Sequence, residues 1–145
     1  FKFNIEDPSN ENNNYLRIKI RKLINQLNQY GLTFEKFNVT LKNLNKSNKA
    51  IEFYVKKNIK ENTKPLNRKK SIIINEFFFN QPDEIVFRSL SELIHSIGNK
   101  ISYTRGKKIL SLISNINSTK NFKKKTLSGC IFEKVNKSII ISREN

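Results

Sequence analysis

Two long segments of this chain repeat apolar side chains at intervals of three and four residues, the spacing of one face of an α-helix. The first repeat consists of Leu16, Ile20, Leu23, Ile24 and Leu27. The second consists of Phe34, Phe37, Leu41, Leu44, Ile51 and Val55, at close to a heptad period. Gly31 is a helix stop between them, and Thr33 can cap the second helix. We expect two amphipathic helices that pack against each other, because Asn48 leaves too few clean heptads for a dimeric coiled coil.

The remainder of the chain reads as short helices and a small β element. Residues 60–70, with Pro65 and little that is apolar, are the best candidate linker. The β-branched run after residue 70 predicts a short strand. The three phenylalanines that follow it at 77–79 are core or a stacking surface, and core is favoured because no basic residue alternates with them.

Two further helices and a hairpin complete this expectation. Pro82 suits the start of a helix that ends at Gly98, and Thr104 can cap the next. Their predicted inner faces are Val86, Leu90, Leu93, Ile94 and Ile97, and then Ile109, Leu110, Ile113 and Ile116. A hairpin of residues 127–132 and 139–142 is expected around "KVNK". The predicted fold class is therefore mainly α with a small C-terminal β hairpin, an α+β protein.

The charge balance points to an anionic partner. The 145 residues carry a formal net charge of +16, and 37% of them are hydrophobic, which is enough for a modest core. Nucleic acid is the leading partner and an acidic membrane surface the second. No apolar run reaches membrane-spanning length, and the one cysteine, Cys130, fits a reducing compartment, so a cytoplasmic protein is expected. His95 has no second histidine or nearby cysteine, so no metal site is predicted.

Several basic residues are candidates for binding RNA. Arg105, Lys107 and Lys108 stand near the start of a predicted helix, where cations oppose the helix dipole. This placement suggests a bound phosphate, and a solvated basic turn is the alternative. The adjacent residues Lys123, Lys124 and Lys125 can reach successive phosphates without reading bases. The remaining candidates, on the first predicted helix, are Lys19 and Lys22.

The start of the chain combines an acidic turn with a basic helix. In "EDPSN", Asp7 and Asn10 can bond to nearby backbone amides while Pro8 fixes its own φ, so a rigid turn is expected. In "YLRIKIR", Arg17 and Arg21 lie four residues apart on one helical face. An ordinary capped helix with a solvated basic face is the alternative interpretation.

These motifs resemble the segment that closes the catalytic domain of bacterial tRNA(Ile)-lysidine synthases. The tail "KKTLSGCIFEKVNKSIIISREN" is similar to the end of that family's shorter members, and "PDEIVFRSLSELIHSIG" and "TRGKKILSLISNI" are similar to its two later helices. The pieces occur in the family's order over most of the chain. Two departures stand out: the family's ATP-gripping string S-G-G-x-D-S is absent, and Ser128 replaces the first glycine of its LGGC-like motif.

The resemblance implies a division of the chain and an activity. Residues 1–31 would end the catalytic domain, 32–62 would form a long helix of the substrate-binding region, and 63–145 a small C-terminal α+β region. The complete enzyme uses ATP with Mg to adenylate C2 of the wobble cytidine in the CAU-anticodon isoleucine tRNA, and lysine then displaces AMP. It is thus a carbon–nitrogen ligase in tRNA processing.

The resemblance also implies roles for the residues of the opening motif. Asp7, Ser9, Asn10, Arg17 and Arg21 would lie at the active-site wall, with the arginines on substrate phosphate. With the ATP loop missing, we expect a fragment that binds tRNA, binds no ATP and has no ligase activity alone. The alternatives are a free-standing basic RNA-binding module and, more weakly, a peripheral membrane protein. A homodimer is a further candidate assembly of the chain.

Overall fold

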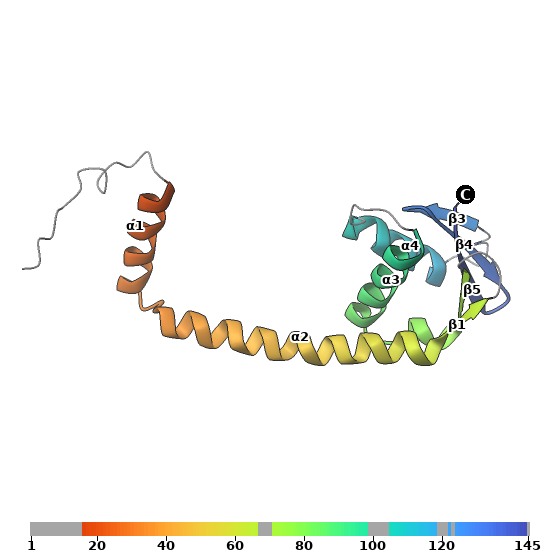
Figure 1. Cartoon of the computed structure of the whole chain (residues 1–145), viewed down its shortest axis with the longest axis horizontal. Coiled ribbons are helices and arrows are strands. Elements are labelled where there is room, and N and C mark those ends of the chain that lie inside the picture. The colour runs from red at the N-terminus through yellow and green to blue at the C-terminus, as the bar shows by residue number, and fades with distance from the viewer. Residues whose placement is uncertain (1–15, 67–70, 99–104, 119–121, 123, 145) are drawn as a thin grey trace, which may run out of the picture. The chain divides into compact units, whose positions relative to one another are not determined.

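The computed structural model describes residues 16–66, 71–98, 105–118, 122 and 124–144 (Figure 1). The chain forms two compact units, Phe1–Ser47 and Asn48–Asn145, and each is described by itself. The described residues form helices α1 (Leu16–Gln29), α2 (Phe34–Asn62), α3 (Asp83–Gly98) and α4 (Gly106–Ser118), which together contain more residues than the five short strands. The prediction of a mainly α, α+β protein is confirmed. The predicted domain boundaries after residues 31 and 62 do not coincide with the division inside α2 and stay predictions.

The junction between α1 and α2 has the geometry that the sequence predicts. Gly31 adopts φ +83°. Its N–H donates to the carbonyl of Asn28, and the Leu32 N–H donates to that of Leu27, both at 3.0 Å. This pair of bonds is a Schellman motif, which satisfies carbonyls that a helix end leaves unpaired. The Thr33 hydroxyl then accepts from the Lys36 N–H at 3.3 Å, which confirms the predicted cap.

The apolar faces of α1 and of the first half of α2 are exposed. Leu23 and Ile24 of α1 are 54% and 49% exposed, and Leu41 and Leu44 of α2 are 47% and 61% exposed. The prediction that the two faces bury each other is wrong in this structure. The reason is that periodicity defines an apolar face but not its partner. The same seam of α2 is buried at Val55, in the part of α2 that belongs to the second unit.

The second unit is built on a five-stranded antiparallel sheet of order β1-β2-β5-β4-β3. Strands β1 (Thr63–Leu66) and β2 (Ser71–Ile74) pair with each other, and β2 pairs with β5 (Ser138–Arg143). The linker predicted at 60–70 is therefore wrong in its described part, because α2 continues to Asn62 and β1 follows directly. Pro65 is tolerated because β1 is an edge strand, where a missing N–H breaks no inner ladder.

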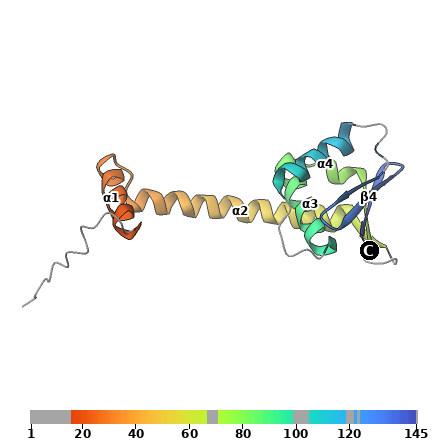
Figure 2. The ribbon, with the colours of Figure 1, turned by 90° about the horizontal axis from the view of Figure 1, so that it is seen from above.

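Helices α3 and α4 lie on the same side of this sheet (Figures 1 and 2). The core between them contains Leu90 from α3 together with Phe132 and Ile141 from the sheet, all fully buried. The predicted inner face of α3 is confirmed at every position. On α4, Leu110 is 54% exposed, and Leu112 is buried instead. The prediction for Leu110 is wrong because α4 is apolar around much of its circumference, so that spacing alone does not fix its buried face.

The three phenylalanines form a 3₁₀ helix, η2 (Glu76–Asn80), rather than continuing the strand. The Asn75 side chain caps it by accepting from the Phe78 N–H at 3.2 Å. Phe78 is fully buried, Phe79 packs on the core, and Phe77 is 58% exposed. The core interpretation therefore holds for two of the three rings.

Two successive hairpins end the chain. Strand β3 (Lys124–Leu127) turns through Ser128 and Gly129 into β4 (Cys130–Val135), which then pairs with β5. The single strand predicted at 127–132 is wrong, because Ser128 and Gly129 have φ of 51° and 78°. Positive φ at both central residues is the requirement of a two-residue type I′ hairpin. The hairpin around "KVNK" is confirmed.

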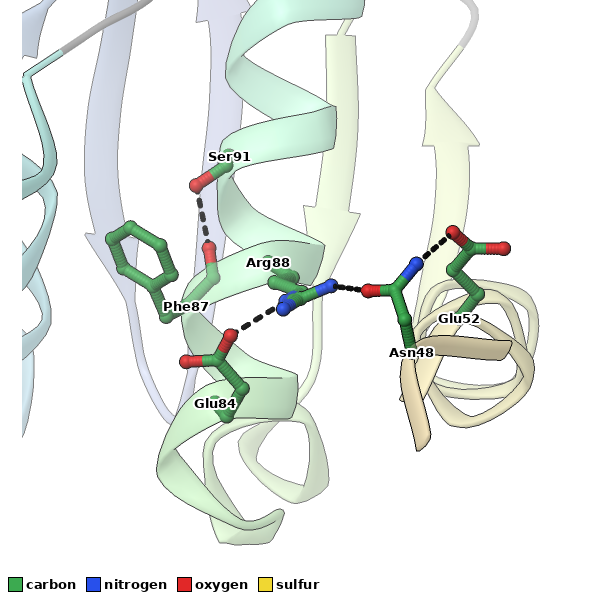
Figure 3. Close-up of polar contacts among 6 residues, drawn as sticks. All are labelled: Asn48, Glu52, Glu84, Phe87, Arg88 and Ser91. Atoms are coloured by element: carbon green, nitrogen blue, oxygen red, sulfur yellow. Dashed lines mark hydrogen bonds and ion pairs between the residues drawn. The ribbon is translucent and has the colours of Figure 1, made fainter. Parts of the chain in front are cut away.

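Two polar links fix the end of α2 on α3. The buried Asn58 amide donates to the Ser89 hydroxyl at 3.2 Å and to the Phe78 carbonyl at 3.4 Å. About three turns nearer the start of α2, Arg88 of α3 donates to the Asn48 side chain at 2.5 Å and bonds Glu84 at 2.6 Å (Figure 3). These bonds place the second half of α2 in the same unit as the sheet.

Candidate nucleic-acid interface

Two of the predicted basic clusters meet at one groove of the second unit. Lys108 from the first turns of α4 and Lys125 from β3 line a cavity of about 90 Å³. The polar residues Ser111, Asn115 and Thr126 also line it; Thr126 does so through its backbone, because its side chain leaves the face of the strand opposite to that of Lys125 and Leu127. Ammonium groups and hydroxyls donate hydrogen bonds to phosphate oxygens, and charge-assisted bonds are the stronger class. The groove can therefore hold an anionic oxygen group.

The core packing of α4 and β3 explains this meeting. Leu112 of α4 is buried, which turns Lys108 and Ser111, one helical turn apart, to the rim. On β3, Leu127 packs on the core, and side chains two residues apart in a strand share a face. Lys125 thus stands on the helix-covered face, opposite Phe132.

The lysine run beside the groove is divided between two faces. Lys124 precedes Lys125 in an extended strand, so the two side chains leave opposite faces of the sheet. Lys124 lies opposite Glu133 on the face away from α3 and α4. Lys123 lies outside the described residues. Of the two described lysines in the run, only Lys125 shares a groove with Lys108.

The start of α4 adds positive potential to the groove. Arg105 precedes the helix and Lys107 lies in its first turn; both are exposed. The first turn of α4 contains no acidic residue. Unpaired N–H groups at a helix start carry partial positive charge, so these cations and the helix end reinforce each other toward an anion. Over the described ranges, the two ion pairs are Arg88–Glu84 and Lys137–Glu76, and neither uses this cluster.

The candidate residues of the opening motif belong to the first unit. Arg17 and Arg21 lie one turn apart on α1 with exposed side chains, as the predicted spacing requires. Lys19 and Lys22 are exposed on the same helix. Asp7, Ser9 and Asn10 lie outside the described residues. The groove is made wholly by the second unit, so the structure does not unite the two sets of candidates.

Sequence reasoning missed the polar residues that complete the groove. Ser111 follows Lys108 by three residues, a helical spacing that was available as a signal. No sequence signal pointed to Thr126, because only the packing of β3 beside α4 brings this residue to the groove. Within residues that the structure describes, no cluster of three or more His, Cys, Asp or Glu side chains could hold a metal ion.

None of the helices in the described ranges is both long enough and apolar enough to cross a bilayer. His95 is exposed on α3. Comparison with protein-family models, with curated proteins and with solved structures finds no match for this chain.

Proposed function

We propose that this chain binds RNA through phosphate contacts made by the Lys108–Lys125 groove. The observation that carries the proposal is the meeting of two separately predicted basic clusters at one polar groove, in a chain of net charge +16. Phosphate contacts of this kind give affinity that is independent of base sequence and falls steeply with salt.

The resemblance of the terminal motifs extends this proposal to a particular RNA. Under it, the bound RNA is the isoleucine tRNA with a CAU anticodon, and the chain supplies tRNA binding to a lysidine-forming ligase. ATP with Mg and free lysine are then substrates of the complete enzyme. The exposed Arg17 and Arg21 on α1 are compatible with contacts to substrate phosphate. The S-G-G-x-D-S string is absent from these residues, so the chain itself is proposed to bind without catalysing.

The binding proposal is tested by the salt dependence of tRNA affinity. Fluorescence anisotropy with labelled tRNA would be measured from 50 to 200 mM NaCl, a range over which ionic contacts change affinity strongly. Each phosphate contact contributes about 0.7 to 0.9 to the slope of log K against log salt, so Lys108→Ala with Lys125→Ala should flatten it by roughly 1.5. The matched control is Lys64→Ala on β1, at the opposite edge of the sheet, which should change the slope far less.

The outcomes test three parts of the proposal separately: the binding site, the identity of the RNA and the role in binding alone. An unchanged slope in the double variant would remove the groove as the binding site. Equal affinity for the CAU isoleucine tRNA and for a tRNA of another anticodon would favour the free-standing RNA-binding module. Formation of lysidine by these 145 residues with ATP and lysine would contradict the assignment of a binding role alone.

A further inference from the structure

A second and larger cavity lies in the same unit, away from the phosphate groove. It has a volume of about 330 Å³ and is formed by η2, the end of α4 and the β4–β5 hairpin. This size is at the lower end of the range for small-ligand pockets. None of the residues that line it also lines the Lys108–Lys125 groove.

The inner wall of this cavity is apolar and includes a fixed aromatic ring. Phe79 lines it together with Ile116 and Ile139, both of which are buried. The Phe79 ring packs edge-to-face on the buried Phe78, with centroids 5.2 Å apart and planes at 64°. Because Phe78 cannot move without disturbing the core, Phe79 is held in place before any ligand arrives. A held aromatic ring is a platform on which a planar ligand can stack.

The rim of the cavity is rich in amides and cations. Asn80, Asn117 and Asn136 contribute side-chain amides, each of which can donate and accept hydrogen bonds. Lys134 and Lys137 add positive charge. Lys137 is paired with Glu76 at 3.3 Å, but their side chains are 81% and 44% exposed, so water weakens this pair and Lys137 can turn to a phosphate.

This combination selects one class of ligand. A simple anion would make no use of the apolar wall, and a hydrocarbon would leave the amide rim without hydrogen-bond partners. A nucleotide satisfies both, because its planar base can stack while its edge bonds to asparagine and its phosphate meets lysine. Resting on the proposed RNA-binding function, we infer that this cavity receives one unpaired nucleotide of the bound RNA.

The test uses the whole chain with two probes that separate base from phosphate. The probes are a ten-nucleotide single-stranded oligo(A) and inorganic polyphosphate. Asn80→Ala with Asn117→Ala removes two exposed amides from the rim, so folding should be preserved, which far-UV circular dichroism would confirm. The loss of two hydrogen bonds should weaken oligo(A) binding about tenfold and leave polyphosphate binding unchanged. The groove variant Lys108→Ala with Lys125→Ala should weaken both probes.

Each outcome bears on a distinct claim. Equal oligo(A) affinity in the wild type and the asparagine variant would overturn the nucleotide cavity and leave the RNA-binding proposal standing. Binding of neither probe to the wild type at low salt would overturn both. If free AMP binds the cavity more tightly than oligo(A), judged by methyl NMR shifts of Ile116 and Ile139, the ligand is a free nucleotide and the inference about RNA is wrong.

Discussion

Replacing Gly98 with alanine should destabilise the protein, although nothing in the local backbone forbids the change. Gly98 is the last residue of α3, and its φ is not in the left-handed region. At a position with compatible backbone angles, a glycine-to-alanine change raises stability by about 0.4 to 1 kcal/mol, because it restricts the unfolded chain. From the backbone conformation alone, the expected change in stability is therefore a gain.

The tertiary contact of Gly98 reverses this sign. A Cβ atom there would lie 2.3 Å from the Ser128 carbonyl oxygen and 3.2 Å from the Cys130 sulfur, where ordinary contacts are 3.4 Å or more. The carbonyl would have to retreat by about 1 Å. It belongs to the tight β3–β4 turn, and the neighbouring Gly129 carbonyl is held by the Glu144 N–H at 2.8 Å. Overpacking of this kind costs about 1 to 3 kcal/mol.

The assay is thermal unfolding followed by circular dichroism at 222 nm. For a unit of this size, such a cost lowers the midpoint of thermal unfolding by roughly 4 to 24 °C. Gly106→Ala at the start of α4 is the matched control. Its Cβ would meet only the Phe87 ring, at 3.5 and 3.7 Å, so its stability should stay equal or rise slightly. A Gly98→Ala variant as stable as the wild type would refute the close approach of α3 to the turn.

Two further predictions follow from burial and from backbone conformation. Leu90→Ala should lower the free energy of unfolding by about 2 to 5 kcal/mol in a urea titration, because Leu90 is fully buried, whereas Leu41→Ala should cost less than about 1 kcal/mol. A large cost at Leu41 would mean that α1 and α2 do bury their apolar faces. Ser128→Asn should raise the free energy of unfolding by about 0.5 to 1 kcal/mol in the same titration, because asparagine tolerates positive φ better than serine. Gly129→Ala should lower it; the opposite order would argue against the type I′ turn.

The elements of this fold were largely predictable from local signals. Spacing located all four α-helices, and the stops at Gly31 and Gly98 are real helix ends. These features depend on interactions within one or two turns, which a sequence window contains. The β content was underpredicted because a strand depends on pairing with another segment, which a short sequence window does not contain. Strand β1, with its Pro65 and exposed pattern, has little strand character until β2 pairs with it.

The candidate site, too, was predictable only in those features that depend on neighbouring residues. The basic clusters around Lys108 and Lys125 were evident in the sequence as charge. Their meeting depends on two leucines, the buried Leu112 in α4 and the half-buried Leu127 in β3, which fix the orientation of both elements. The alternation that separates Lys124 from Lys125 follows only once β3 is known to be a strand.

The sequence by itself determined which segments form the α-helices, where α1 and α3 end, and that the chain has a strong positive charge, since each depends on composition or on contacts between near neighbours. The tertiary structure alone decided which apolar faces are buried. Val55 and Leu41 lie on the same seam of α2, yet one is in the core and the other is 47% exposed. It also decided that Gly98 must remain a glycine and that two distant lysines share a groove, because these depend on pairings between residues that no local pattern encodes.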